Sequence, residues 1–83
     1  MYKVLIGGRA EKDLDSLELP LKNRIIEQLL ALKHNPRPQG AKKLAASKVG
    51  WRLRIGDWRV LYEIDDKDKE VRIYRIKHRS RAY

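Results

Sequence analysis

The sequence contains no cysteine among its 83 residues, so neither a disulfide framework nor a thiolate metal site can hold the fold together. It also lacks an apolar run near the roughly 20 residues of a membrane span, and its apolar N-terminal stretch is too short for a signal peptide. We therefore expect a cytoplasmic protein without membrane association. A chain of this length builds one modest core, which predicts a single domain over residues 1–83.

Several kinds of catalytic site also lack their sequence patterns. The two histidines, His34 and His78, lie far apart, and no carboxylate pair has metal-ligand spacing. The serines have no evident partners for a catalytic triad, and the Gly7-Gly8 pair lacks the rest of a phosphate-binding loop. The sequence therefore predicts neither a metal site nor a bound cofactor.

Positive charge is the strongest signal in the composition. The chain carries 20 basic and 11 acidic residues, a formal net charge of +9. Residues 41–83 contribute +7 of this charge and residues 1–40 only +2, and no acidic residue follows Glu70. Such a field attracts polyanions. Nucleic acid is the first candidate partner, ahead of an acidic protein or an anionic membrane surface, and charge that merely maintains solubility is the plain alternative.

The hydrophobic periodicity predicts an α+β fold in the order β-α-α-β-β-β. A helix with Ala10 and Leu14 on its buried face and Asp13 facing water is followed by a second helix that Pro20 begins. Residues 37–50 read as a connection in which 41–44 could form a helical turn. Strands are expected at 2–6, 51–55, 58–64 and 71–77. We expect an antiparallel sheet with the N-terminal helical hairpin packed on one face.

The hairpin at residues 51–64 predicts a cluster of arginines. With Gly56 and Asp57 as the loop, Arg54 lies opposite Arg59. Alternation then places the apolar residues, including Trp51 and Trp58, on the helix side, where we expect them in the core rather than as base-stacking platforms. It places Arg52, Arg54 and Arg59 on the other side. Facing like charges destabilise a sheet, whereas an anion between them would relieve the repulsion, and guanidinium groups bind phosphate bidentately.

The C-terminal tail is expected beside this arginine cluster. Apolar spacing changes near Arg75, which indicates a bulge or strand end. If the last strand pairs with the middle one, its end lies near the Gly56 turn and brings His78, Arg79 and Tyr83 to the cluster. RNA cleavage by its own 2′-hydroxyl requires a base, an acid and positive charge on the phosphate. Histidine titrates in the useful range, and a tyrosine would need nearby cations to lower its pKa.

These residues match a known family along nearly the whole chain. The sequence resembles the RelE/ParE superfamily of toxins from prokaryotic toxin–antitoxin systems, and within it the RelE-like mRNA interferases. The likeness includes Ala10-Glu-Lys-Asp-Leu14, Asn35-Pro36, Ala41-Lys-Lys-Leu44, Trp51-Arg-Leu-Arg-Ile-Gly-Asp-Trp-Arg-Val-Leu-Tyr62 and a terminal His78-Arg79…Tyr83.

The resemblance implies a RelE-like fold and a metal-independent endoribonuclease that cuts the mRNA codon in the ribosomal A site and so arrests translation. Arg59 matches the phosphate-stabilising arginine of the family. Arg52 and Arg54 stand where a family member has lysines and are expected to act as electrostatic clamps. Arg79 matches the C-terminal arginine, Tyr83 the tyrosine proposed as base, and His78 is a substitute for it.

The resemblance also implies partners. A cognate antitoxin is expected to bind in a toxin–antitoxin hetero-oligomer, and the basic face is expected to contact the ribosome, its rRNA and the mRNA, with Lys43, Lys77 and Arg81 as further RNA-binding residues. Two alternatives remain at this point: a ParE-like DNA gyrase poison, and a non-catalytic or degenerate RelE-like domain that binds RNA or ribosomes. The arginine set favours the nuclease.

Overall fold

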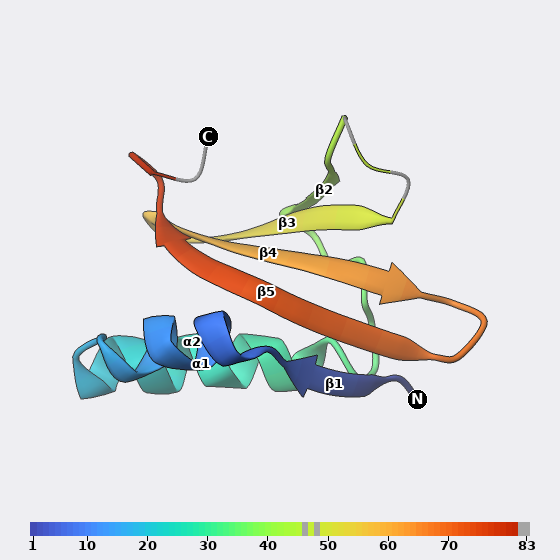
Figure 1. Ribbon diagram of the computed structural model, residues 1–83. Coiled ribbons are helices and arrows are strands. Elements are labelled where there is room, and N and C mark those ends of the chain that lie inside the picture. Colours follow the sequence, from blue (N-terminus) through green and yellow to red (C-terminus); the bar gives the residue numbers. More distant parts are fainter. Residues whose placement is uncertain (46, 48, 82–83) are drawn as a thin grey trace.

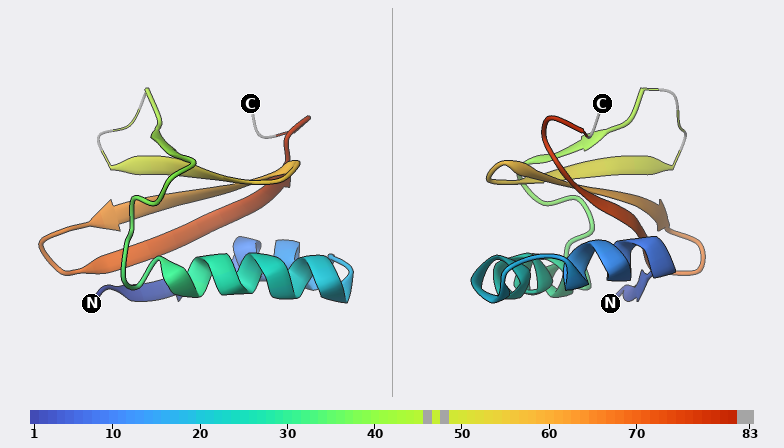
Figure 2. Two further views of the ribbon diagram at one scale, coloured as in Figure 1. Left: turned by 180° about the vertical axis from the view of Figure 1, so that it is seen from behind. Right: turned by 60° about the vertical axis from the view of Figure 1, so that its left-hand side comes forward.

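The computed structural model describes residues 1–45, 47 and 49–81, which form two helices on one face of a five-stranded sheet (Figure 1, Figure 2). The α+β class and the helical hairpin on one face agree with the prediction. Neither described helix is long and apolar enough to cross a membrane. In chain order, the elements are β1 (Lys3–Ile6), α1 (Gly8–Asp15), α2 (Leu19–Ala31), β2 (Ala41–Lys43), β3 (Gly50–Ile55), β4 (Trp58–Asp65) and β5 (Glu70–His78).

The sheet is mixed, with the strand order β1-β5-β4-β3-β2, and this corrects the expectation of an antiparallel sheet. The pairs β2–β3, β3–β4 and β4–β5 are antiparallel. Strand β1 instead runs parallel to β5, with Val4 beside Val71. The sequence pattern does not distinguish the two directions, because a strand shows the same alternation of side chains whichever way its neighbour runs. Only the path of the chain through the helices sets the direction of β1.

The β3–β4 hairpin has the predicted register. Arg54 lies opposite Arg59 and Ile55 opposite Trp58. Gly56, the first loop residue, has a φ of 59°, a conformation that glycine adopts without steric cost and that two-residue hairpin loops require at this position. The hairpin thus fixes which side chains face the helices and which face away.

Strand β5 contains the predicted irregularity. Leu61 lies opposite Arg75 while the adjacent Tyr62 lies opposite Ile73, so Tyr74 is the extra residue of a bulge. A bulge inserts one residue into one strand of a pair and so shifts the alternation of side chains. Ile76 returns to the core as a result, although it is three residues from Ile73.

Strand β2 replaces the helical turn that was expected at 41–44. It pairs antiparallel with β3, and Lys42 lies opposite Arg52. The outer edge of β3 would otherwise expose unpaired backbone groups, which a neighbouring segment can satisfy. A segment this short has no period from which the sequence could predict a strand.

Helix α1 contacts β5 through Asp13. The sequence analysis expected this side chain to face water, and that expectation is wrong. Strand β1 covers β5 only as far as Ile73, and beyond it the Asp13 carboxylate accepts hydrogen bonds from the Ile76 N–H at 2.9 Å and from Arg75 Nε at 2.9 Å. Partial burial acts to raise the pKa of Asp13, but the hydrogen bonds from Arg75 and Ile76 outweigh it and hold that pKa below its ordinary value. Asp13 thus accepts the hydrogen bond of a backbone N–H at the edge of β5 that β1 does not cover.

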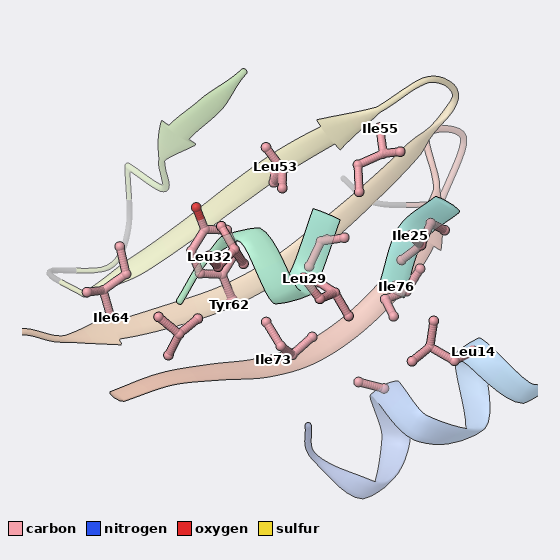
Figure 3. Close-up of a cluster of buried hydrophobic side chains, with 13 residues drawn as sticks. Leu14, Ile25, Leu29, Leu32, Leu53, Ile55, Tyr62, Ile64, Ile73 and Ile76 are labelled. Atoms are coloured by element: carbon pink, nitrogen blue, oxygen red, sulfur yellow. The ribbon is translucent and has the colours of Figure 1, made fainter. Parts of the chain in front are cut away.

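The core lies between the helices and the sheet (Figure 3). Tyr62 is the largest fully buried side chain, and its hydroxyl donates a 2.8 Å hydrogen bond to the carbonyl of Pro36. Burial raises the pKa of Tyr62 to about 12, with Arg37 acting in the opposite direction. Trp51 and Trp58 pack against the core but are only partly buried. The buried hydrophobic residues are Ala10, Leu14, Ile25, Leu29, Leu32, Leu53, Ile55, Val60, Tyr62, Ile64, Val71, Ile73 and Ile76.

Candidate nucleic-acid interface

A row of cations crosses the uncovered face of the sheet beside the β3–β4 turn. Arg54 of β3 lies opposite Arg59 of β4, and Arg59 lies opposite Lys77 of β5. In the next row, Arg52 lies between Lys42 and Leu61. These residues alternate with buried ones, so they point away from the helices. The predicted juxtaposition of Arg54 and Arg59 is therefore present, and Lys77 extends it to a third strand. We call these three residues the arginine row.

The Arg59 guanidinium is anchored at the turn. Its Nη1 donates to the carbonyl oxygens of Gly56 at 3.1 Å and of Trp58 at 3.0 Å. These two hydrogen bonds hold the guanidinium in place beside the turn. Arg59 is thus a positioned cation, as stabilisation of an anionic transition state requires.

Arg79 also reaches this turn, as the pairing of the last strand predicted. Its backbone N–H donates to the Asp57 carbonyl at 2.7 Å, and its Nε lies 3.9 Å from Asp57 Oδ1. Both side chains are about two-thirds exposed, at 64% and 65%, so the ion pair itself contributes little. The backbone contact is what places Arg79 beside the arginine row.

The sequence analysis missed Arg24 at this position. A Cβ built on Gly56 would lie 3.7 Å from Arg24 Nη1, so α2 brings a further guanidinium to the turn from the helix side. In the sequence Arg24 is an ordinary exposed residue of an amphipathic helix, far from the arginine cluster. No local pattern could have identified it.

The backbone of His78 lies near the arginine row, but its side chain does not. It pairs with Trp58, and the two rings meet edge to face with centroids 5.4 Å apart. Its Nδ1 lies 3.1 Å from Ser80 Oγ and accepts a longer bond from the Ser80 N–H. The structure thus separates His78 from the arginines that the sequence grouped with it, since neighbours along a strand point to opposite faces.

The remaining predicted residues lie in different places. Lys43 lies opposite Trp51, on the other side of the sheet from Arg52, and its neighbour Lys42 takes the place expected for it. Arg81 is exposed, and its N–H donates to the His78 carbonyl at 2.8 Å. Tyr83, the predicted base, lies outside the described residues.

A pocket of about 530 Å³ opens at the free edge of β5. Helix α1, the end of β5 and the tail surround it, and Trp58 forms part of its wall. The described lining residues are Asp13, Ser16, Trp58, Arg75, Ile76, Lys77, His78, Ser80 and Arg81.

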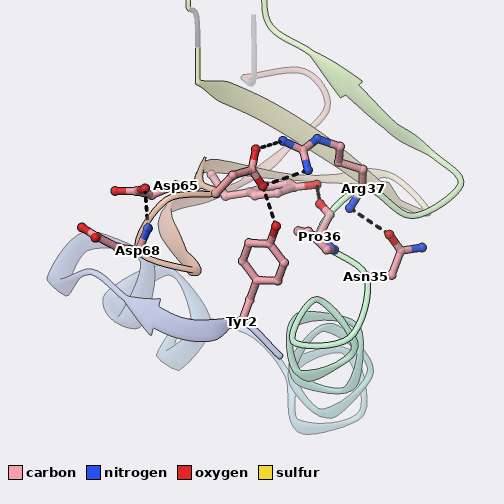
Figure 4. A network of polar contacts seen from close by, with 8 residues as sticks. Tyr2, Asn35, Pro36, Arg37, Asp65 and Asp68 are labelled. Carbon is pink, nitrogen blue, oxygen red and sulfur yellow. Dashed lines mark hydrogen bonds and ion pairs between the residues drawn. The ribbon is translucent and has the colours of Figure 1, made fainter.

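At the other end of the sheet, carboxylates bind the arginines (Figure 4). Arg37 forms a two-pronged ion pair with Asp66, at 2.7 Å and 3.3 Å, and the Tyr2 hydroxyl donates to the same carboxylate. The hydrogen bonds of Arg37, and then of Tyr2, lower the pKa of Asp66 to about 2. This network ties the N-terminus and the segment after α2 to the β4–β5 turn.

Three carboxylates close to this network could also hold a cation. Ligand oxygens of Asp65, Asp68 and Glu70 lie within 4.8 Å of one another, a grouping that the sequence analysis did not anticipate. The Arg72 guanidinium already binds two of them, Glu70 at 2.6 Å and Asp65 at 3.5 Å. The arrangement is that of an ion-pair network on the surface.

Comparison with known proteins identifies the family. The sequence model described as the ParE toxin of the type II toxin–antitoxin system parDE matches residues 4–83. The chain is 34% identical to the RelE1 protein of Methanocaldococcus jannaschii over 85 residues, covering 99% of this chain and 94% of that protein.

Two solved structures resemble the fold closely. The RelE–RelB complex of Pyrococcus horikoshii matches with a TM-score of 0.85 and 34% identity over 98% of both chains. The RelBE2 toxin–antitoxin complex of Mycobacterium tuberculosis matches with a TM-score of 0.81 and 30% identity over 94% of this chain and 98% of that one. The chain therefore belongs to the RelE/ParE superfamily and is a RelE-like toxin of a type II toxin–antitoxin system.

Proposed function

We propose that this toxin is a metal-independent endoribonuclease that cuts mRNA codons in the ribosomal A site and so arrests translation. The observation that carries the proposal is the row of Arg54, Arg59 and Lys77 on the uncovered face, with Arg79 at the adjoining turn. This is where a polyanion can approach, because the helices cover only the opposite face of the sheet (Figure 1).

The reaction is an attack of the RNA 2′-oxygen on the adjacent phosphorus, with loss of the 5′-oxygen. A base takes the proton of the 2′-hydroxyl, and an acid gives a proton to the leaving oxygen. The phosphate gains negative charge in the transition state, and the anchored Arg59 with Arg52 and Arg54 stabilises that charge. Arginine keeps its proton at usable pH and cannot serve as the base. The family resemblance proposes Tyr83 as the base, with His78 as its substitute, although the His78 ring lies against Trp58 and not beside Arg59.

The expected partners follow from the same proposal. The relatives from P. horikoshii and M. tuberculosis are complexes of toxin and antitoxin. By analogy this chain, as a single cytoplasmic domain, forms a hetero-oligomer with a cognate antitoxin that carries an acidic or amphipathic segment. Its basic face, including Lys77 and Arg81, contacts rRNA and mRNA when the antitoxin is absent.

A ParE-like gyrase poison is the second candidate, because the matching family model is described as a ParE toxin. The arginine set favours the nuclease over this alternative. A domain that binds RNA without cutting it is the third candidate.

The deciding experiment maps mRNA 5′ ends after the purified toxin is added to a translating reaction, with naked mRNA in parallel. Cuts within codons that require ribosomes support the proposal. Cuts on naked RNA indicate a free ribonuclease instead. If neither RNA is cut, the nuclease assignment is wrong, and a gyrase cleavage assay then separates the ParE alternative from simple binding.

A further inference from the structure

The pocket at the free edge of β5 has a wall composition that the proposed cleavage chemistry does not require. Trp58 contributes a partly exposed aromatic ring, and His78 meets that ring edge to face. Ser16 and Ser80 also line the pocket; the Ser16 hydroxyl donates to the Asp13 carbonyl at 2.7 Å, and the Ser80 hydroxyl lies 3.1 Å from His78 Nδ1. An aromatic surface with adjoining donors and acceptors is the combination that single-stranded RNA-binding proteins use for an unstacked base.

The charges around the pocket favour a ligand with a phosphate. Lys77 and Arg81 line it together with Arg75. Of the described lining residues, Asp13 is the one acid, and its carboxylate is already bound by Arg75 and the Ile76 N–H. The acid therefore does not cancel the charge of Lys77 and Arg81, and an anionic group is attracted to the rim.

The pocket and the arginine row share the end of β5, although the row lies on the uncovered face and the His78 ring on the other side of the sheet. Lys77 lines the pocket and also lies opposite Arg59, while the next residue, His78, lies against Trp58. One strand end thus joins the two surfaces. The volume of about 530 Å³ falls in the usual range of small-ligand pockets.

We propose that this pocket binds one nucleotide of single-stranded RNA, with the base on Trp58 and the phosphate between Lys77 and Arg81. The inference rests on the proposed function in that the bound nucleotide adjoins the scissile phosphate. It assigns Trp58 a role in substrate positioning that the sequence analysis did not give it.

The two tryptophans provide an internal control for the test. Trp51 lies away from the pocket, and the Arg37 guanidinium lies 5.3 Å from the centre of its ring. The indole N–H signals of the ¹⁵N-labelled toxin are followed by NMR while adenosine 5′-monophosphate, ribose 5-phosphate or inorganic phosphate is added. We expect the nucleotide to shift the Trp58 signal saturably while Trp51 changes little, and the two base-free phosphates to have a much smaller effect.

Three results of the titration would overturn the proposal. They are no shift of Trp58 at millimolar nucleotide, equal shifts of both indoles, and a shift of Trp58 that ribose 5-phosphate reproduces in full. The last would indicate an anion site without base recognition.

Variants give a second, independent measurement. Stacking of a base on an aromatic residue is worth a factor of roughly ten or more in affinity when the ring is removed, so Trp58→Ala should weaken nucleotide binding by about that factor. Because that variant could unfold, Trp58→Phe is compared with Trp51→Phe, both checked by thermal unfolding. A several-fold loss confined to Trp58→Phe supports the pocket, and equal losses contradict it.

Failure of this inference and failure of the proposed function are distinguishable. Nucleotide binding at Trp58 without mRNA cleavage would retain the pocket and remove the nuclease. Cleavage of mRNA by a toxin whose Trp58 signal does not shift with nucleotide would retain the nuclease and remove the pocket.

Discussion

The two ends of the sheet use arginine in different ways. At the β4–β5 turn, carboxylates hold Arg37 and Arg72 in ion pairs at 2.7 Å and 2.6 Å. At the β3–β4 turn, Arg59 is held by uncharged carbonyls, and Arg79 meets a carboxylate only at 3.9 Å with both groups exposed. Carboxylates of the described chain bind the arginines at the first end, which we call the satisfied end. Carbonyl oxygens position the Arg59 guanidinium at the other, which we call the cationic end.

On this difference we assign a structural role to Arg37 and Arg72 and propose a functional one for Arg59. An arginine bound by an acid fixes the fold and offers little to a ligand, because its charge is already neutralised. An arginine held by backbone carbonyls is fixed in position but still attracts an anion. The cationic end is therefore where RNA is expected to bind, and four changes test the comparison.

The largest expected effect is on cleavage. Replacing Arg59 with alanine removes a positioned charge that stabilises the transition state, and such losses typically reduce rates by about 10²–10³-fold. The rate of codon cutting in the translating reaction measures it. Arg72→Ala at the satisfied end is the matched control and should change the rate by less than about two-fold. Equal losses in both variants would remove the distinction between the two ends.

A second change probes the stability of the satisfied end. In Tyr62→Phe the buried carbonyl of Pro36 loses its 2.8 Å hydrogen bond, which should lower the free energy of unfolding by about 1–3 kcal/mol. Urea unfolding provides the measurement, and codon cutting by the folded variant should be unaffected. The raised pKa of Tyr62 adds a pH dependence: the folded state resists ionisation, so stability present below pH about 10 is lost as the pH rises toward 12.

A third change examines the salt dependence of RNA binding. Each phosphate contact to a single strand contributes about −0.7 to the slope of log K against log salt concentration. Arg54→Ala should reduce the magnitude of the slope by about that amount, whereas Arg72→Ala should leave it unaltered. Filter binding of a short RNA across a salt series gives both slopes. An unchanged slope in Arg54→Ala would place the RNA elsewhere.

The smallest expected effect is acid sensitivity at the satisfied end. Folding lowers the pKa of Asp66 to about 2, so the ionised group contributes stability above about pH 4 that is lost as the pH falls toward 2. Asp66→Asn removes this contribution. The stability difference between wild type and variant, from thermal unfolding, should therefore shrink over that interval. A constant difference would mean that the Arg37 pair does not act through charge.

The sequence predicted the hairpin elements well and the spatial grouping of the site only in part. The period-two pattern and the Gly56-Asp57 loop fixed the pairing of Arg54 with Arg59, because register in a two-residue hairpin is set locally. The altered spacing near Arg75 located the bulge. Strand β2 and the parallel pairing of β1 were missed, since they depend on which edges the folded chain leaves available.

The same division applies to the site residues. Local alternation correctly placed Arg52, Arg54 and Arg59 on the uncovered face. The faces of Lys43 and His78 depended on a short strand and a bulged strand that the pattern could not resolve. Arg24 comes to the turn from a helix 32 residues earlier in the chain, where nothing marks it. The role of Tyr83 stays a prediction, because that residue lies outside the part of the chain that the structure describes.

The sequence by itself determined the α+β class, the excess of positive charge in residues 41–83 and the facing arginines of the hairpin, since composition, periodicity and turn chemistry are local properties. Only the tertiary structure decided which carboxylates bind Arg37 and Arg75. Arg37 and Asp66 are 29 residues apart, and Asp13 and Arg75 are 62 apart. Ion pairing depends on distances of a few ångströms, and folding alone brings such distant residues within that range.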